Sequence, residues 1–213
     1  MALKEGGLLA VAASALSEGI RTRLRDAVRS VYSAATDRPD VKRPFPVGRN
    51  FAASLGYPPE VLASLPAVAV DAFAGVSNVA AFADIPQGAR VLDLGCGAGL
   101  DSLITARRVG AQGKVIGIDL SDDMLARARK AAAEVGDVNI TLCRADAESL
   151  PIQDGAMDVA LVNGIFNLNP EREMIFRELA RVMRVGGTVF AAELILSEPL
   201  PTATHFSEAD WFA

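Results

Sequence analysis

A glycine-rich loop holds the first residues whose types and spacing could do chemistry. Asp93 stands two residues before the first of three alternating glycines, in the run Asp93-Leu94-Gly95-Cys96-Gly97-Ala98-Gly99. Glycines that follow a strand allow a tight turn and let a ligand approach the backbone closely. The dinucleotide pattern GxGxxG would need a glycine at position 100, where this chain has Leu100. The acid favours a cation or an uncharged ribose over a pyrophosphate; the alternative is an ordinary strand-to-helix turn.

Two more acids end the apolar runs that follow. Asp119, followed by Leu120, can accept hydrogen bonds from both hydroxyls of a ribose. The alternative for Asp119 is an acid at a helix N-terminus, but Ser121 and two further acids already serve that end. Asp146 and Ala147 follow the third run, where the carboxylate and the backbone amide could together read the edge of an adenine. The alternative for Asp146 is an Asx-type loop residue.

Strands and helices alternate around these loops. We predict strands over 90–94, 115–119, 140–144, 158–162 and 188–194, and helices over 102–109, 121–136 and 170–184. The last helix should turn five residues inward, Ile175, Phe176, Leu179, Val182 and Met183, and Gly186-Gly187 should turn the chain into the fifth strand. This alternation predicts an α/β fold with a doubly wound, mainly parallel sheet. Ligands of such sheets bind beyond the carboxyl ends of the strands, where the acids and glycines lie.

The first part of the chain reads as helices and loops. Apolar residues recur at helical spacing from Ile20 to Tyr32, and this helix should end by Arg38 because proline follows. Short helices are predicted over 59–65 and 77–83, the second with Ser77 as its N-cap. We interpret residues 1–87 as a helical N-terminal extension that acts as a lid on a core of residues 88–196.

Composition excludes several classes of protein. The 213 residues are 51% hydrophobic and 22% charged, which excludes disorder across the whole chain. A net charge of −5 disfavours a nucleic-acid scaffold. Two cysteines and one histidine favour a reducing, cytoplasmic setting and exclude a two-histidine zinc motif, so we predict no metal site. The longest apolar run, from Leu8 to Leu16, is too short to span a membrane, and Glu5 weakens a secretory signal.

Four motifs in order resemble those of class I S-adenosylmethionine-dependent methyltransferases: DLGCGAG, VIGIDLS, RADAESLPI and MDVALVN. The resemblance covers residues 88–196 and implies a Rossmann-like fold with S-adenosylmethionine as cofactor. It also implies a role for each motif residue. Asp93, Gly95 and Gly97, with Cys96 between the glycines, would line the methionine end, Asp119 and Leu120 the ribose, and Asp146 and Ala147 the adenine, while Asn163 would open onto the substrate.

A narrower resemblance links the segments VRSVYSAAT, SLGYPPEVLASLP and VNGIFNLNPEREMIFRELARVMRVGG to arsenite methyltransferases. It implies that Tyr32 lies over the cofactor. That family carries Asn-Cys where this chain has Asn163-Gly164. Arsenic(III) is a soft ion that needs several thiolates, and only Cys96 and Cys143 are present. The sequence therefore predicts methyl transfer to a small-molecule acceptor, on an arsenite-methyltransferase-like scaffold in which Gly164 replaces the substrate thiol.

Other functions stay open. The scaffold could methylate a small organic acceptor at carbon, oxygen or nitrogen, or it could bind the cofactor without catalysis. Leu100 disfavours a nicotinamide-dependent dehydrogenase. We assign no catalytic base, since His205 lies among small and polar residues near the chain end and reads as a surface histidine rather than a base.

The end of the chain suggests a continuation. Residues 197–213 read as the start of a truncated C-terminal region, because Ser207 to Asp210 resembles a capping box with barely one helical turn after it. The fifth strand would then present an apolar edge that includes Val189 and Leu194. Such an edge predicts self-association.

Overall fold

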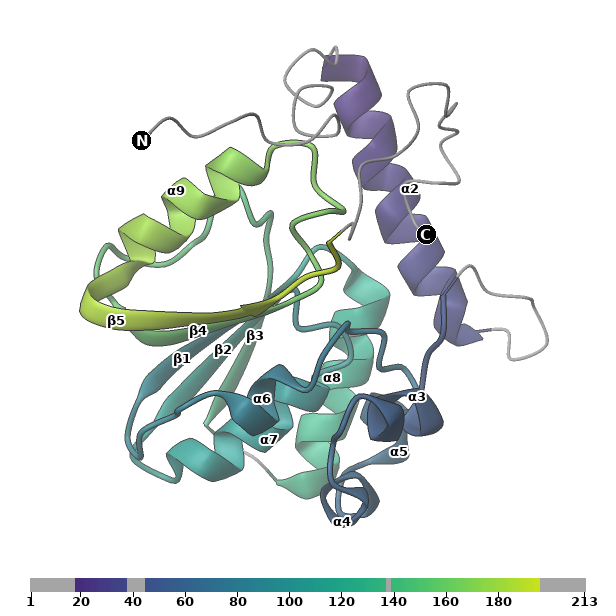
Figure 1. Cartoon of the computed structure of the whole chain (residues 1–213), viewed down its shortest axis with the longest axis vertical. Helices are drawn as coiled ribbons and strands as arrows, with labels where there is room; N and C mark the ends of the chain where they lie inside the picture. Colours follow the sequence, from purple (N-terminus) through teal and green to yellow (C-terminus); the bar gives the residue numbers. More distant parts are fainter. Residues whose placement is uncertain (1–17, 38–44, 137–138, 196–213) are drawn as a thin grey trace.

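The computed structural model describes residues 18–37, 45–136 and 139–195, which form an α/β unit around one sheet (Figure 1). The predictions for His205, for the capping box at Ser207 and for the run from Leu8 to Leu16 concern residues outside the described ranges. In the described part, no helix combines the length and apolar character that crossing a membrane requires.

The sheet has five parallel strands in the order β3-β2-β1-β4-β5. The strands are β1 (Arg90–Leu94), β2 (Lys114–Asp119), β3 (Ile140–Arg144), β4 (Met157–Asn163) and β5 (Met183–Ala192). The order reverses between β1 and β4, so the predicted doubly wound parallel sheet is confirmed. Crevices at such a reversal, beyond the strands' carboxyl ends, are where ligands bind in this class of fold.

Helices cover both faces of the sheet because alternate strand residues point to opposite sides. Val91 packs into a core with Leu103 of α7 (Leu100–Val109), whereas Leu92 packs with Ile175 of α9 (Arg172–Val182). Figure 1 shows α7 and α8 (Asp122–Val135) on one face and α9 on the other. The predicted cap of α8 is confirmed, since Ser121 Oγ accepts from the Met124 amide at 3.3 Å.

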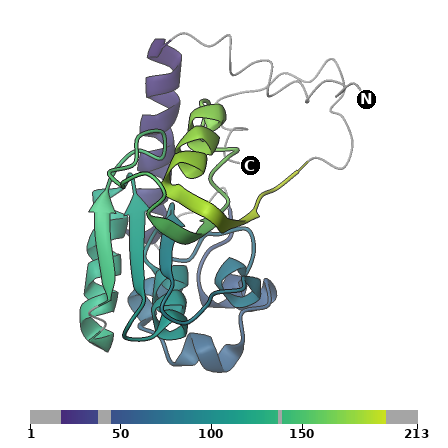
Figure 2. The same ribbon diagram turned by 90° about the vertical axis from the view of Figure 1, so that its left-hand side faces the viewer.

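The N-terminal segments reach the carboxyl end of the sheet. The predicted first helix is present as α2 (Glu18–Asp37), which rises beyond the strand ends (Figure 2). Four short helices follow: α3 (Arg49–Ser54), α4 (Pro59–Ala63), α5 (Ala67–Val70) and α6 (Val79–Phe82). They join the same core as α7, with Tyr57 and Leu62 among its fully buried members. This packing fixes the loop before α6 next to β4.

Three expectations about individual residues are wrong. The N-cap of α6 is Asn78 rather than Ser77, and it makes no side-chain cap bond. Phe176 is 53% exposed and stacks on Phe166 instead of entering the core. Gly186 and Gly187 do not precede the fifth strand, because β5 begins at Met183.

The glycines of β5 lie in an irregularity of the ladder. Met183 pairs with Met157, while Thr188 pairs with Val159, so extra residues are accommodated between the two pairs. β5 ends the sheet, and Val189 on it is 40% exposed. Self-association through this edge stays a prediction.

Candidate functional site

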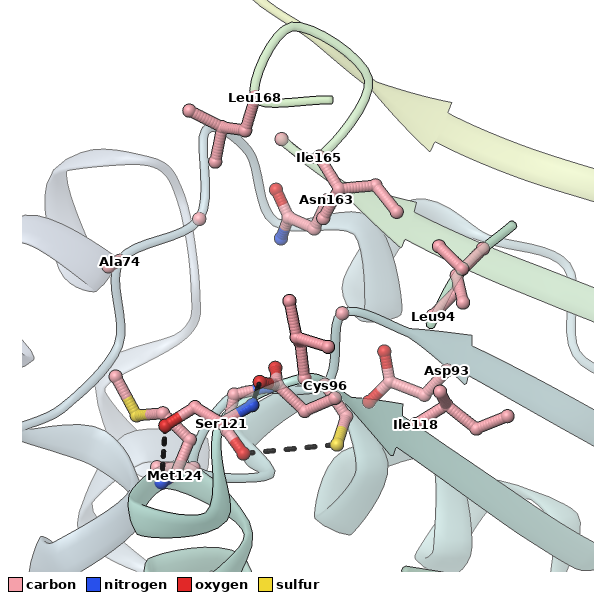
Figure 3. A pocket seen from close by; sticks show the side chains of 18 of the residues that line it. Ala74, Asp93, Leu94, Cys96, Ile118, Ser121, Met124, Asn163, Ile165 and Leu168 are labelled. Carbon is pink, nitrogen blue, oxygen red and sulfur yellow. Dashed lines mark hydrogen bonds between the residues drawn. The ribbon is translucent and has the colours of Figure 1, made fainter. Parts of the chain in front are cut away.

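A pocket opens at the carboxyl ends of β1, β2 and β4 (Figure 3), and residues of α2 line it as well. Its wall includes Asp93, Gly95, Cys96, Gly97, Asp119, Leu120, Asp146, Ala147 and Asn163. The structure thus brings together nine of the ten residues that were expected to bind the cofactor. Tyr32 lies in α2, but its side chain is outside the described part.

The glycine loop turns sharply and is tied to the neighbouring strand. Gly95, Gly97 and Gly99 have φ angles of 75°, 52° and 87°. The amides of Gly95 and Cys96 donate to the Ile118 carbonyl at 2.8 and 2.9 Å, which fixes the loop against the end of β2. A β-carbon at Gly95 would lie 2.4 Å from Cγ2 of Ile165. Glycine is therefore required there both for its backbone angle and for the close approach of the loop after β4.

Asp119 couples the two loops that flank the pocket. Its Oδ2 accepts from the Gly97 amide and its Oδ1 from the Ser121 amide, each at 2.8 Å. Burial raises the pKa of this carboxyl, while these backbone donors lower it. Each carboxylate oxygen keeps a second lone pair, which a ligand hydroxyl could use.

Asp146 combines features of the two roles considered from the sequence, an Asx-type loop residue and a ligand-binding residue. Its Oδ1 accepts from the Glu148 amide at 3.1 Å, as an Asx-type loop residue does. Its Oδ2 lies 3.8 Å from Nη1 of Arg25, and the residue lines the pocket beside Ala147. The loop role and a ligand role are therefore compatible.

The two cysteines do not come together. Cys96 lines the pocket, but its sulfur lies close to Gly117 of β2, and burial and Asp93 raise the pKa of its thiol well above its usual value. Cys143 lies in β3, half-buried, and its Sγ is 3.5 Å from the Arg144 carbonyl. Within the described ranges, no group of three or more His, Cys, Asp or Glu residues could hold a metal ion.

Asn163 fixes a loop that forms one wall of the pocket. Its Oδ1 accepts from the amides of Val76 and Ser77 at 2.8 and 3.1 Å. Its Nδ2 donates to the Ser77 carbonyl at 2.7 Å and to Oδ2 of Asp101 at 2.9 Å. These contacts use both donors and both acceptor positions of the amide. A β-carbon at Gly75 would lie 2.6 Å from Nδ2, so the loop approaches Asn163 as closely as glycine allows.

Sequence reasoning missed Tyr57 and Asp101. Asp101 lines the pocket from the first turn of α7 and accepts a hydrogen bond from the Tyr57 hydroxyl. An acid directly after a glycine loop could have been noticed, since a helix N-terminus favours negative charge. Nothing in the sequence pattern links Tyr57 to it.

Arg25 holds α2 next to the pocket through a charged hydrogen bond. The Arg25 guanidinium hydrogen-bonds Glu148, and the two side chains are 29% and 14% exposed. Val28 and Arg29, one turn further along α2, line the pocket as well. The contact joins the helix to the loop after β3.

We expect Arg25→Met to weaken ligand binding in this pocket about 5-fold, because it removes the charged contact but keeps the side-chain length. Calorimetric titration at two salt concentrations measures the effect, and the loss should shrink at high salt. Arg23→Met, an exposed position on the same helix, is the matched control and should leave affinity unchanged. Equal losses in both variants would contradict the role of Arg25.

Asp93 makes stability depend on pH. Burial, and next the Asp101 carboxylate, raise the pKa of Asp93 from its usual 3.8 to about 8. Between these values the unfolded chain loses a proton that the folded chain retains, so the free energy of unfolding should fall as pH rises through this window. Thermal melts of the ligand-free chain from pH 5 to pH 9 measure the slope. Asp93→Asn, which can keep the Ser102 hydrogen bond, should flatten it, and an unchanged slope would contradict the assignment.

The sheet order, the glycine loop after β1 and the acid at the end of β2 define a Rossmann-like fold with a ligand pocket at its topological switch point. Residues 85–211 match the methyltransferase domain family, and the chain belongs to that family. The family's cofactor is S-adenosylmethionine.

Named relatives point in two directions. An arsenite methyltransferase of Halobacterium salinarum is 36% identical over 147 residues, which are 69% of this chain and 37% of that protein. A demethylmenaquinone methyltransferase of Shouchella clausii is 35% identical over 130 residues, 61% of this chain and 53% of that protein. The crystal structure of an arsenic(III) S-adenosylmethionine methyltransferase from Chlamydomonas reinhardtii is 29% identical, with a TM-score of 0.63 over 70% of this chain and 53% of that one. The chain thus spans only part of each relative.

Proposed function

We propose that this chain binds S-adenosylmethionine in the pocket and transfers its methyl group to a small-molecule acceptor. The observation that carries the proposal is the coupling of Gly97 to Asp119, which places a glycine loop and an acid of adjacent strands against one cavity. A pyrophosphate would meet the Asp119 carboxyl and would gain little from the neighbouring Asp93, whereas a sulfonium and a ribose would not be repelled.

The lining residues suit the parts of this cofactor. Asp93 with the loop of Gly95, Cys96 and Gly97 would hold the methionine end, and Asp119 with Leu120 the ribose. Asp146 and Ala147 would hold the adenine. Tyr32 would cover the cofactor from α2, which we propose acts as the lid. The cofactor supplies an activated methyl group; the protein's own contribution is to position the reactants and to exclude water.

The methyl acceptor is proposed to be an organic molecule rather than arsenic(III). Gly164 follows Asn163, has a φ of 77°, and a β-carbon on it would lie 2.9 Å from Cγ1 of Val76. A thiol at this position would therefore need both a strained backbone and a shift of Val76. With Cys96 held as a thiol and Cys143 outside the pocket wall, a set of thiolates for arsenic(III) is missing from the described residues. An organic acceptor, the kind that the names of the demethylmenaquinone methyltransferases indicate, fits this wall better.

We expect the chain to transfer labelled methyl groups to members of a panel of quinols and other small aromatic acceptors, and to leave arsenite with glutathione at the no-enzyme rate. Liquid chromatography of the labelled products measures both. Gly164→Cys should not create arsenite turnover, because the backbone resists the side chain. Robust arsenite methylation that disappears in Cys143→Ser would show that the thiol site had been misplaced. Cofactor binding without turnover of any acceptor would favour a binding protein.

A further inference from the structure

Two carboxylates lie beneath the pocket without a cationic partner. Asp93 at the end of β1 is 3% exposed and Asp101 in α7 is 6% exposed, and both line the pocket. No arginine or lysine of the described segments forms an ion pair with either. Burial raises the pKa of both carboxyls, and the charge of Asp101 raises that of Asp93 further.

All side-chain donors that reach these carboxylates are neutral. Ser102 Oγ donates to Asp93 Oδ2 at 2.5 Å, and Asn163 Nδ2 donates to Asp101 Oδ2 at 2.9 Å. The Tyr57 hydroxyl donates to Asp101 Oδ1. The Ser102 backbone, also uncharged, lowers the pKa of Asp93 as well. Figure 3 shows the Asp93 carboxylate in the pocket wall with Asn163 on the opposite side of the same space.

A buried acid without a counter-charge is unfavourable, and a positive charge in the pocket would relieve it. S-adenosylmethionine and its product S-adenosylhomocysteine share the amino and carboxyl groups of the methionine arm. They differ in charge only at sulfur, which is a sulfonium before transfer and a neutral thioether after it. A carboxylate that is ionised in the pocket therefore distinguishes the two ligands.

Resting on the proposed binding of S-adenosylmethionine, we infer that Asp101 acts together with Asp93 to hold the sulfonium charge, so that these two acids strengthen binding of the cofactor more than binding of its product. Tyr57 is a positioning residue, because it reaches the ligand only through Asp101.

Asp101→Asn removes the charge and can keep the network. The new amide oxygen can accept from Asn163, and the new amide nitrogen can donate to the Tyr57 oxygen. The Tyr57 hydroxyl can then donate to the Ser77 carbonyl, 3.3 Å away. The fold should therefore tolerate this variant.

The test compares dissociation constants of S-adenosylmethionine and S-adenosylhomocysteine for the full chain by calorimetry. In Asp101→Asn, affinity for the sulfonium should fall about 10-fold more than affinity for the thioether. Asp84→Asn is the matched control, since this exposed acid precedes β1 at the other end of the sheet, and it should change neither. Equal losses for both ligands in Asp101→Asn would overturn the inference. If the wild-type chain binds neither ligand, the proposed function itself fails.

A second variant separates the effect of the Tyr57 hydroxyl on Asp101 from the packing of the Tyr57 ring. Tyr57→Phe keeps the edge-to-face contact with Phe73, whose ring centre is 5.1 Å away, but removes a donor that lowers the pKa of Asp101. The groups that face Asp101 are Tyr57, Asp93, Asn163 and the Ala80 amide, with Asp119 acting on Asp93. Since this strengthening of cofactor binding needs an ionised Asp101, it should set in at a higher pH in Tyr57→Phe than in the wild type. An unchanged pH profile would contradict the role of Tyr57.

Discussion

Replacing Asp119 by alanine should weaken binding of S-adenosylmethionine and S-adenosylhomocysteine about 10- to 100-fold. The carboxylate would accept from both ribose hydroxyls, and losing such charge-assisted hydrogen bonds typically costs ~1.5–3 kcal/mol. Part of the loss would come from the glycine loop, because Gly97 and Ser121 donate to the same carboxylate. Isothermal titration calorimetry measures the affinity.

The control for this variant is Asp122→Ala, which removes an acid with a 71% exposed side chain from the first turn of α8. It should leave affinity within about 2-fold of the wild type. Circular dichroism and a thermal melt establish that both variants fold. Wild-type affinity in Asp119→Ala would contradict the ribose assignment.

Adding one methyl group at Gly95 should reduce cofactor affinity at least 10-fold. The new carbon would lie 2.4 Å from Ile165 Cγ2, and the φ of 75° would be strained for alanine. Forcing extra atoms into a packed site typically costs ~1–3 kcal/mol, and here the displaced residue lines the pocket.

Gly136→Ala is a control that introduces backbone strain without a steric clash. Gly136 ends α8 with a φ of 71°, and a β-carbon there would have no atom within 4 Å. This variant should lose about 1 kcal/mol of stability and no cofactor affinity. Equal affinity losses in the two glycine variants would show that the close approach of Ile165 has no part in shaping the pocket.

The strands and the acids at their ends could be predicted because their signals are local. Runs such as residues 159–162 of β4 are apolar over their whole length, as strands covered on both faces are, and parallel strands bring their carboxyl ends to one edge. The Tyr57–Asp101–Asn163 network could not be predicted, because its members are far apart in the chain and meet only through tertiary packing.

The wrong expectations for Phe176 and Ser77 also come from tertiary contacts. Phe176 has the helical spacing of a core residue, but it lies at the border of the buried face of α9, where it stacks on the core residue Phe166 and stays 53% exposed. Ser77 has the residue type of an N-cap, but its backbone amide donates to Asn163, so the helix begins after Asn78. In both cases a tertiary contact overrides a local preference.

One titration tests cofactor binding by this chain: S-adenosylhomocysteine and NAD are each added to the full chain in a calorimeter. We expect saturable, one-to-one binding of S-adenosylhomocysteine, weakened about 10- to 100-fold in Asp119→Ala, and no heat from NAD, since Leu100 replaces a glycine of the dinucleotide pattern. Binding of NAD without binding of S-adenosylhomocysteine would contradict this expectation.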